Sequence, residues 1–361
     1  MLVRGEKHHT RRQQKGGMSV THHREGRGES IDEEAAVFDS PIESSRRHHT
    51  HWRLLLWRKL RYLHYKRSIV VFTIILVIST IKVLLGLDKT ELRKNFRTQR
   101  RVPRFNTSIP YDHLIVVAGH AVLMEIDKIG RADRDESIWY LEDYQRGQDL
   151  PFEFVTHVKA GVERAARDPN AMLLFSGGQT RPDAGPRSEA LSYYLLAEYF
   201  NWWNFPFVAE RTQLEEYARD SFENLLFSLC RFSELSYGRY PKQLSVVSFN
   251  FKRTRFERLH APALRFPPHR FQFIPQNPLA NYPRTRFNFA RAAQGEANTI
   301  LPFRRDPYAC FSDLKKKRKS RDPFHRSVPY GGPSSCSKMA PLLSHCGPHY
   351  YNASKLPWAA T

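Results

Sequence analysis

Residues 113–120 read HLIVVAGH, residues 171–179 read AMLLFSGGQ, and residues 244–249 read LSVVSF. Each stretch contains a short apolar run of the kind found in strands buried on both faces of a sheet. Shorter runs at 205–209 and 271–274 are interpreted as two further strands. Stretches with helical spacing separate the strands, at residues 152–167, 188–200, 219–235 and 254–264. Strands separated by helices of this length predict an α/β fold with a Rossmann-like, doubly wound and mostly parallel sheet.

A long apolar run precedes this domain. Residues 69–87 read IVVFTIILVISTIKVLLGL, enough to cross a hydrocarbon core of about 30 Å as a helix. We therefore predict one transmembrane helix at 68–87, which makes the chain an integral membrane protein. Residues 1–50 are rich in Arg, His, Gly and Ser without apolar periodicity, and residues 1–67 are predicted as a disordered basic tail.

The remaining parts of the chain follow from composition. Residues 88–110 form a basic juxtamembrane stalk that can touch anionic lipid headgroups. The α/β domain is predicted at 111–275. Residues 276–361 are rich in Pro, Arg, Tyr and Ser, and are interpreted as a loop-rich basic extension, partly disordered, that wraps on the domain.

The orientation in the membrane is weakly encoded. Basic clusters flank both ends of the apolar run, so the positive-inside rule barely discriminates. Asn106 and Asn352 begin glycosylation sequons, which matter only in a secretory lumen. Together with the long basic tail, which favours retention in the cytosol, they predict a Golgi or ER protein with its domain in the lumen. The alternative is a domain that faces the cytoplasm.

The formal net charge of +21 favours negatively charged partners, which include nucleic acid, anionic lipid and phosphorylated substrates. The charge is spread along the chain and no nucleic-acid-binding motif occurs, so we expect no nucleic-acid partner. Four cysteines allow three disulfide pairings, and free thiols are the alternative. Their spacing matches no metal site, and none is predicted.

In an open parallel sheet, ligands bind at the carboxyl ends of the strands, where four segments of this chain fall. In the first, Gly119 permits close approach of a ligand and His120 can titrate near neutral pH, although a plain turn is the alternative. In the second, Ser176, Gly177 and Gly178 can form a cradle of backbone N–H groups for an anion. A tight turn explains that second motif equally well.

The third segment concentrates carboxylates. Glu215, Asp220 and Glu223 lie close together in the sequence, and a carboxylate pair can do general acid–base work or hold a divalent metal. Asp220 or Ser221 can cap the helix that carries Glu223 and Asn224. Capping explains at least part of this pattern.

The fourth segment is basic. Ser248 ends a strand, and Lys252, Arg253 and Arg255 follow it, so cations gather at the carboxyl edge of the sheet. Arginine can hold phosphate or carboxylate with two hydrogen bonds. A solvated basic face on a helix is the alternative.

In this order, the four segments resemble the SanA/ElyC/YdcF family of α/β domains of unknown function. Its pattern is a strand ending in glycine, then SGG followed by SEA, ExxSxNTxEN, and a strand ending VT-S before HxxRA. The matching residues over 111–275 are Gly119, Ser176-Gly177-Gly178, Ser188-Glu189-Ala190, Glu215, Ser221, Glu223, Asn224, Val247-Ser248 and Arg255.

The chain also departs from the family pattern, because Lys252 stands for the histidine, and Ala218 and Asp220 stand for Ser and Asn. These changes suggest a eukaryotic, fungal-like branch with an added anchor and extension. The resemblance implies a Rossmann-like sheet with a polar pocket. Bacterial membrane members are linked to envelope integrity and a soluble one to S-adenosylmethionine, but neither activity nor cofactor transfers.

The leading hypothesis from the sequence is a membrane-anchored pocket protein that binds or processes an anionic nucleotide-like or phospho-sugar compound. Glu189, Glu215 and Glu223 would orient hydroxyls or a metal, and Lys252 and Arg255 would bind negative charge. Glu215, Glu223 and Lys252 are the catalytic candidates. The alternative is a non-enzymatic adaptor whose C-terminal extension makes the contacts. The cofactor and the oligomeric state stay unknown.

Overall fold

The computed structural model describes residues 43–84, 104–277, 285–332 and 335–359. The chain divides into two units, residues 1–100 and 101–361, each of which is described by itself. The predicted tail before residue 43, residues 85–87 of the predicted span, and most of the predicted stalk lie outside the described residues.

The first unit contains one long helix, α1 (Glu43–Leu84). Its stretch Leu56–Ile81, 26 residues, is long and apolar enough to cross a membrane, and none of it is buried within the protein. Large apolar side chains such as Phe72 and Val70 are exposed along it. The helix begins earlier than we predicted, so residues 43–67 are helical rather than disordered. The backbone hydrogen bonds of the helix continue through this basic segment because Leu, Trp, Arg and Lys are all compatible with a helix.

The second unit is an α/β domain whose sheet runs in the order β5-β4-β1-β6-β7, with every pairing parallel. The strands of the domain are β1 (His113–Ala118), β2 (Val122–Leu123), β3 (Trp139–Tyr140), β4 (Ala171–Ser176), β5 (Thr212–Glu215), β6 (Gln243–Phe249) and β7 (Phe271–Gln276). Strands β2 and β3 form a separate antiparallel pair. The predicted parallel α/β fold is confirmed.

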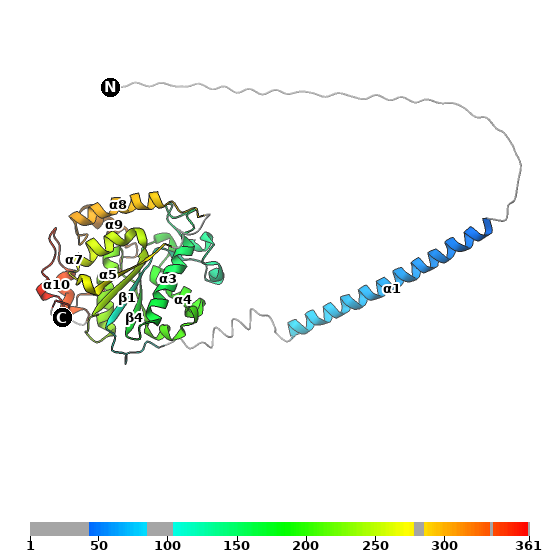
Figure 1. The fold of residues 1–361 in the computed structure, drawn as a ribbon, viewed down its shortest axis with the longest axis horizontal. Coiled ribbons are helices and arrows are strands. Elements are labelled where there is room, and N and C mark those ends of the chain that lie inside the picture. The colour runs from blue at the N-terminus through cyan, green and yellow to red at the C-terminus, as the bar shows by residue number, and fades with distance from the viewer. Residues whose placement is uncertain (1–42, 85–103, 278–284, 333–334, 360–361) are drawn as a thin grey trace, which may run out of the picture. The chain divides into compact units, whose positions relative to one another are not determined.

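The helices of the domain are α3 (Leu150–Ala166), α4 (Glu189–Tyr199), α5 (Ser221–Leu235), α6 (Arg253–Arg255), α7 (Ala261–Ala263), α8 (Phe289–Arg305), α9 (Ser312–Ser320) and α10 (Ala340–Leu343). A π-helical turn (Phe256–His260) joins α6 to α7. Helices α3 and α4 lie on one side of the sheet and α5 lies on the other (Figure 1).

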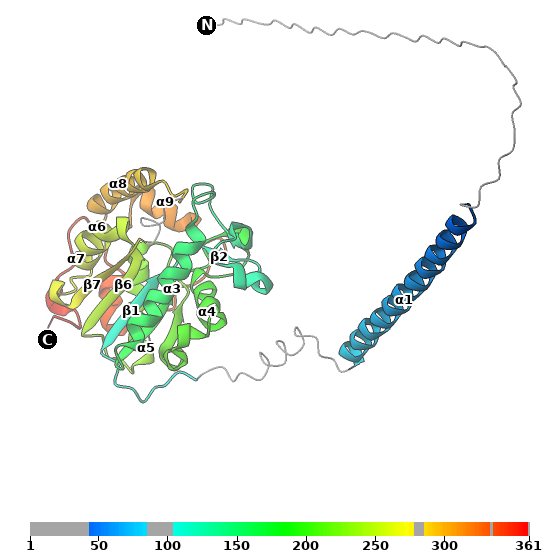
Figure 2. The same cartoon turned by 45° about the vertical axis from the view of Figure 1, so that its right-hand side comes forward.

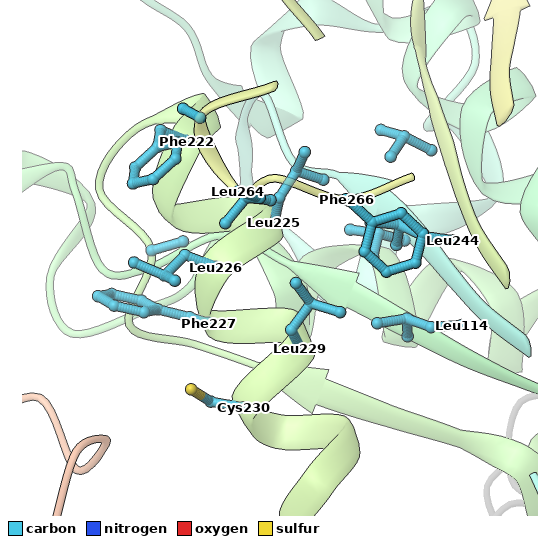
Figure 3. Packing of buried hydrophobic residues seen from close by; sticks show 14 of the residues in the cluster. Leu114, Phe222, Leu225, Leu226, Phe227, Leu229, Cys230, Leu244, Leu264 and Phe266 are labelled. Carbon is cyan, nitrogen blue, oxygen red and sulfur yellow. The ribbon is translucent and has the colours of Figure 1, made fainter. Parts of the chain in front are cut away.

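Two apolar clusters cover the two faces of the sheet, because successive residues of β1 point to opposite sides. Ile115 and Val117 pack in the cluster with α3 and α4. Leu114 and Val116 pack in the cluster with α5. Figure 3 shows Leu225 and Leu229 of α5 in this second cluster.

One predicted strand is wrong. Phe205 precedes a 3-10 helix (Pro206–Arg211) that contains residues 206–209, and the strand at that edge of the sheet is β5, directly after it. Pro206 lacks a backbone N–H and suits the first turn of a helix. The sequence of β5, TQLE, has little apolar character, so the apolar run before it was mistaken for the strand.

The C-terminal extension is more ordered than we predicted. It forms α8, α9 and α10, one disulfide ties it to Cys230 of α5 through Cys336, and a second joins its own Cys310 and Cys346. Figure 2 shows α8 and α9 beside α6, near the ends of β6 and β7. Helix α8 buries only Glu296 and Phe303 well and contains Pro302, so its polar composition and its proline made it read as a loop although its apolar residues have helical spacing.

Candidate functional site

A cavity of about 1000 Å³ lies at the carboxyl ends of β1 and β6, where the fold class places ligands. The turn after β1, the start of α5 and the segment after β6 form its walls. Helices α8 and α9 of the C-terminal extension contribute further lining residues. The charged residues that line it are Glu142, Arg181, Glu189, Arg219, Asp220, Lys252, Arg255, Arg291, Glu296, Lys317 and Arg321.

His120 and Lys252 meet at one wall of the cavity. Lys252 Nζ lies 3.2 Å from His120 Nδ1, and His120 Nε2 lies 3.3 Å from Ser248 Oγ. A charged lysine can only donate, so Nδ1 accepts and Nε2 carries the proton toward Ser248. Burial, reinforced by Lys252, holds the pKa of His120 well below its usual range, so the imidazole is neutral.

Lys252 itself is an unusual cation. Its ammonium lies 5.0 Å from the ring centre of Phe249 and 5.8 Å from that of Phe251. Burial, with the charge of Arg255 adding to it, lowers the pKa of Lys252 to about 7. The side chain therefore changes charge near neutral pH, and a bound anion would favour its protonated form.

Positive charge exceeds negative charge at the cavity. Within the described part of the chain, Lys252, Lys317 and Arg321 make no ion pair with a carboxylate, although all three line the cavity. Arg321 donates to the backbone oxygen of Arg219 at 3.0 Å. Burial, with Arg321 and Arg255 adding to it, lowers the pKa of Lys317 to about 8. Like charges held this close destabilise one another until an anion joins them.

The predicted anion cradle at Ser176-Gly177-Gly178 is not present. Gly177 N donates to the backbone oxygen of Glu215 at 3.0 Å, and Gly178 N donates to that of Ala218 at 2.8 Å. Both N–H groups are therefore occupied by the protein. A Cβ on Gly178 would lie 2.6 Å from the oxygen of Ala218, which explains why the motif needs glycine there.

Glu215 and Glu223, two of the three catalytic candidates, do not line the cavity. Glu215 is fully buried, where it accepts from Ser176 Oγ at 2.7 Å and from Tyr217 N at 2.7 Å. Burial raises the pKa of Glu215 to about 7. Asn224 Oδ1 accepts from the same Ser176 hydroxyl at 3.0 Å. These groups hold β4, β5 and α5 together below the cavity.

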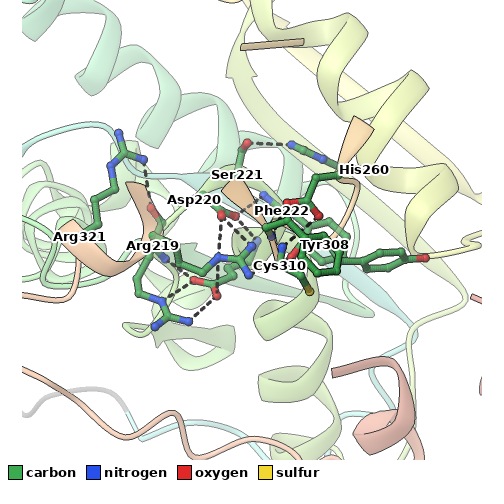
Figure 4. A network of polar contacts seen from close by, with 12 residues as sticks. Arg219, Asp220, Ser221, Phe222, His260, Tyr308, Cys310 and Arg321 are labelled. Atoms are coloured by element: carbon green, nitrogen blue, oxygen red, sulfur yellow. Dashed lines mark hydrogen bonds and ion pairs between the residues drawn. The ribbon is translucent and has the colours of Figure 1, made fainter. Parts of the chain in front are cut away.

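Glu223 belongs to a charge network at the start of α5 (Figure 4). It pairs with Arg219 at 2.6 Å and with Arg318 of α9 at 3.1 Å. Arg318 also pairs with Asp220 at 2.7 Å. Asp220 caps α5 by accepting from the backbone N–H groups of Phe222 and Glu223. This network joins α9 to α5 and places Lys317 and Arg321 over the cavity.

Asp220 is thus the helix cap, which leaves Ser221 free of that role. Ser221 Oγ lies 2.8 Å from His260 Nε2, the contact shown in Figure 4. Arg255 Nη1 donates to the same oxygen at 3.2 Å, and Arg255 Nη2 pairs with Glu296 of α8 at 2.8 Å. Ser221, Arg255 and Glu296 all line the cavity.

Glu189 sits where α4 begins, against the sheet. It is buried, accepts from Thr180 Oγ1 at 3.2 Å, and lies 3.7 Å from Arg181. A Cβ on Gly119 would lie 2.6 Å from the Cβ of Glu189, so Gly119 permits this close approach of α4. Arg181 also pairs with Glu142, which completes this side of the cavity.

The structure brings eight predicted site residues to the cavity: Gly119, His120, Glu189, Asp220, Ser221, Asn224, Lys252 and Arg255. Ser176, Gly177, Gly178 and Ser248 lie beneath it with Glu215 and Glu223. Sequence reasoning missed Arg181, His260, Glu296, Lys317 and Arg321. The basic run at 315–321 was visible, but nothing in it indicated which part of the domain it covers. Among the described residues, no group of three His, Cys, Asp or Glu side chains is placed to hold a metal ion.

Comparison with known proteins identifies a relative without a known activity. The chain is similar to the uncharacterized protein YOR238W of Saccharomyces cerevisiae, with 27% identity over 266 aligned positions that cover 62% of this chain and 88% of that protein. No family model matches the chain, and no solved structure matches it. The resemblance to the SanA/ElyC/YdcF family therefore stays a prediction.

Proposed function

We propose that the α/β domain binds an anionic small molecule, a nucleotide-like or phospho-sugar compound, in the cavity at the carboxyl edge of its sheet. The observation that carries this proposal is a group of cavity-lining cations that make no ion pair with a carboxylate in the described structure, Lys252, Arg291, Lys317 and Arg321. Lys252 and Arg321 are half-buried and Lys317 is exposed beside them, and a ligand phosphate would supply the negative charge that these cations lack. The proposal agrees with the sequence-based family resemblance, which implies a polar pocket.

We further infer that the chain is a single-pass membrane protein of the Golgi or ER whose domain lies in the lumen. All four cysteines are paired in two disulfides. Disulfides persist in oxidising compartments and are rare in the cytosol. The secretory pathway would then supply the ligand.

Binding can be measured on the full-length protein in detergent, with adenosine 5′-monophosphate and glucose 1-phosphate as probes of the two compound classes. We expect at least one to bind, and the double substitution Lys252→Ala and Lys317→Ala to weaken it by ~10-fold or more, because two charge-assisted contacts are lost. Lys128→Ala is the matched control, since Lys128 is exposed and pairs with Glu125 away from the cavity. Binding of neither probe, or equal affinity in all variants, would overturn the proposal.

Deleting the C-terminal extension cannot by itself test the adaptor hypothesis. Residues 300–361 include Lys317 and Arg321, so deleting them damages the cavity as well as any contact surface. Substituting exposed residues of α8, such as Leu301→Ser, alters the outer surface alone. A cellular defect from Leu301→Ser, with cavity variants silent, would favour the adaptor.

A further inference from the structure

The pairing of Ser221 with His260 lies at the cavity wall, apart from the contacts that cap α5. Ser221 does not cap α5, since Asp220 does. His260 is fully buried in the helical segment after β6, and its other ring nitrogen, Nδ1, has no hydrogen-bond partner among the described residues. The hydroxyl that contacts the His260 imidazole lines the cavity. The imidazole is therefore directed at the cavity.

Three aromatic rings hold His260 in place. Its ring centre lies 4.7 Å from that of Phe303, 5.5 Å from that of Phe256 and 5.8 Å from that of Phe222, all close to edge-on. These contacts fix the ring without a carboxylate behind it. Packing on three sides therefore keeps Nε2 aimed at Ser221.

The contact with Arg255 leaves the hydroxyl hydrogen of Ser221 available. A guanidinium can only donate, so its contact with Ser221 Oγ occupies one oxygen lone pair. The hydroxyl hydrogen is then free to point at His260 Nε2, 2.8 Å away. This is the arrangement of a nucleophile and its base, with the oxygen at the cavity wall.

We propose that Ser221 is a nucleophile for phosphoryl transfer and that His260 is its general base. This inference rests on the proposed function, because it assumes that a phosphate ester occupies the cavity. Arg255 touches Ser221 Oγ directly, and Lys252 lines the same cavity, so both can hold the phosphoryl oxygens as charge develops.

The reaction balances within these groups and water. Ser221 Oγ forms a bond to phosphorus while the bond from phosphorus to the leaving oxygen breaks. The proton of Ser221 passes to His260 Nε2 and then to the leaving oxygen. A water molecule next attacks the phosphoserine, gives its proton to His260, and releases phosphate, and that proton returns to Ser221 Oγ.

The surroundings of His260 bear on its basicity. Burial, with the charge of Arg255 adding to it, lowers the pKa of His260 to about 3, so Nε2 keeps its lone pair at neutral pH. A phosphate dianion beside Arg255 offsets the guanidinium charge and makes His260 a stronger base when the ligand is bound. The empty site is thus less reactive than the occupied one.

A fluorophosphonate probe tests the nucleophile directly, since an activated serine displaces its fluoride and keeps the phosphonyl group. The full-length protein in detergent is incubated with the probe beside trypsin as a positive control, and modified peptides are identified by mass spectrometry. We expect modification at Ser221, its loss in Ser221→Ala, and labelling at least ~10-fold slower in His260→Gln. Ser228→Ala, a buried serine of the same helix away from the cavity, should label at the wild-type rate.

Two results would overturn the inference: an unmodified Ser221 while trypsin is labelled, or an unchanged rate in a folded His260→Gln protein. If His260→Gln fails to fold, His260→Asn replaces it, and Ser221→Ala alone still tests the nucleophile. Adenosine 5′-monophosphate binding separates this inference from the proposed function. Wild-type protein that binds the nucleotide but is not labelled refutes the nucleophile and leaves the binding site standing.

Discussion

Lys252 is the residue whose chemistry depends most on its surroundings. Its pKa is lowered to about 7 because burial disfavours the ammonium and Arg255 repels it. The protonated form is present below this pH and is lost as the pH rises through it. A bound anion needs the protonated form, so ligand binding near neutral pH should draw a proton from the solvent.

We therefore expect the affinity for a phosphate ligand to fall by ~10-fold between pH 6 and pH 8, as one charge-assisted contact is lost. Calorimetry in two buffers of different ionisation enthalpy measures both the affinity and the proton uptake. Lys252→Met shows the part of the slope that comes from ionisation of the ligand itself. A wild-type slope no steeper than that of Lys252→Met would contradict the prediction.

Glu215 should make stability depend on pH in a defined window. Burial raises its pKa to about 7 in the folded protein, above the ordinary value of 4.5. Between these values the folded state binds more protons than the unfolded state, so the free energy of unfolding should decrease as the pH rises. One pKa unit corresponds to 1.36 kcal/mol, so the free energy of unfolding should fall by ~3 kcal/mol between pH 4.5 and pH 7.

The substitution Glu215→Gln removes this titration and can keep an acceptor for Ser176 and Tyr217. Denaturant unfolding at pH 5 and pH 7 should show a smaller decrease in the variant than in the wild type. Glu163→Gln, on a partly exposed residue of α3, is the control and should behave like the wild type. Equal decreases in all three proteins would rule out Glu215 as the source.

At the scale of elements, Arg318 is a buried ionic link between α9 and α5. Arg318 is largely buried and pairs with both Asp220 and Glu223. Removing one partner of a buried ion pair leaves an uncompensated charge, which typically costs ~3–5 kcal/mol. Arg318→Ala should therefore lower the melting temperature and weaken phosphate binding, because Lys317 and Arg321 lose their position.

The neighbouring substitution Lys316→Ala is the matched control, since Lys316 is exposed on the same helix. Thermal unfolding of both variants measures the melting temperature, and ligand titration measures the affinity for phosphate. If Arg318→Ala and Lys316→Ala behave alike, α9 is positioned by something other than the Arg318 network.

The two disulfides close loops of different length. Cys230 and Cys336 are 106 residues apart, and Cys310 and Cys346 are 36 residues apart. In the chain-entropy account, the longer loop stabilises the fold more, by ~1 kcal/mol. Replacing Cys230 and Cys336 by alanine should thus lower the free energy of unfolding more than replacing Cys310 and Cys346. Denaturant unfolding of the two double variants measures the difference, and the reverse order would contradict it.

At the scale of the whole molecule, the lumenal placement of the domain predicts that it is glycosylated. We expect N-glycosidase treatment of protein from eukaryotic cells to increase its mobility, and Asn106→Gln with Asn352→Gln to abolish that shift. Asn352 is exposed, so its sequon is accessible on the folded surface. Protease digestion of the domain on intact microsomes, together with no shift, would instead place it in the cytosol.

Residue patterns alone were enough to predict the parallel sheet and the apolar segment. The strands β1, β4 and β6 are continuous apolar runs, and such runs indicate strands buried on both faces wherever they occur. The apolar stretch of α1 is defined by length and composition, which need no tertiary contact to interpret. Strand β5 was missed because an edge strand can be polar.

Only the tertiary structure decided which predicted site residues face a ligand. Glu215 ends β5 and Lys252 follows β6, yet one lies under the cavity and the other lines it. Lys317, Arg321 and Glu296 reach the site from a segment that follows the last strand. A cavity is made by side chains far apart in the chain, and local sequence patterns report only on local backbone and burial. That is why the fold was predictable from the sequence, whereas the composition of the site was not.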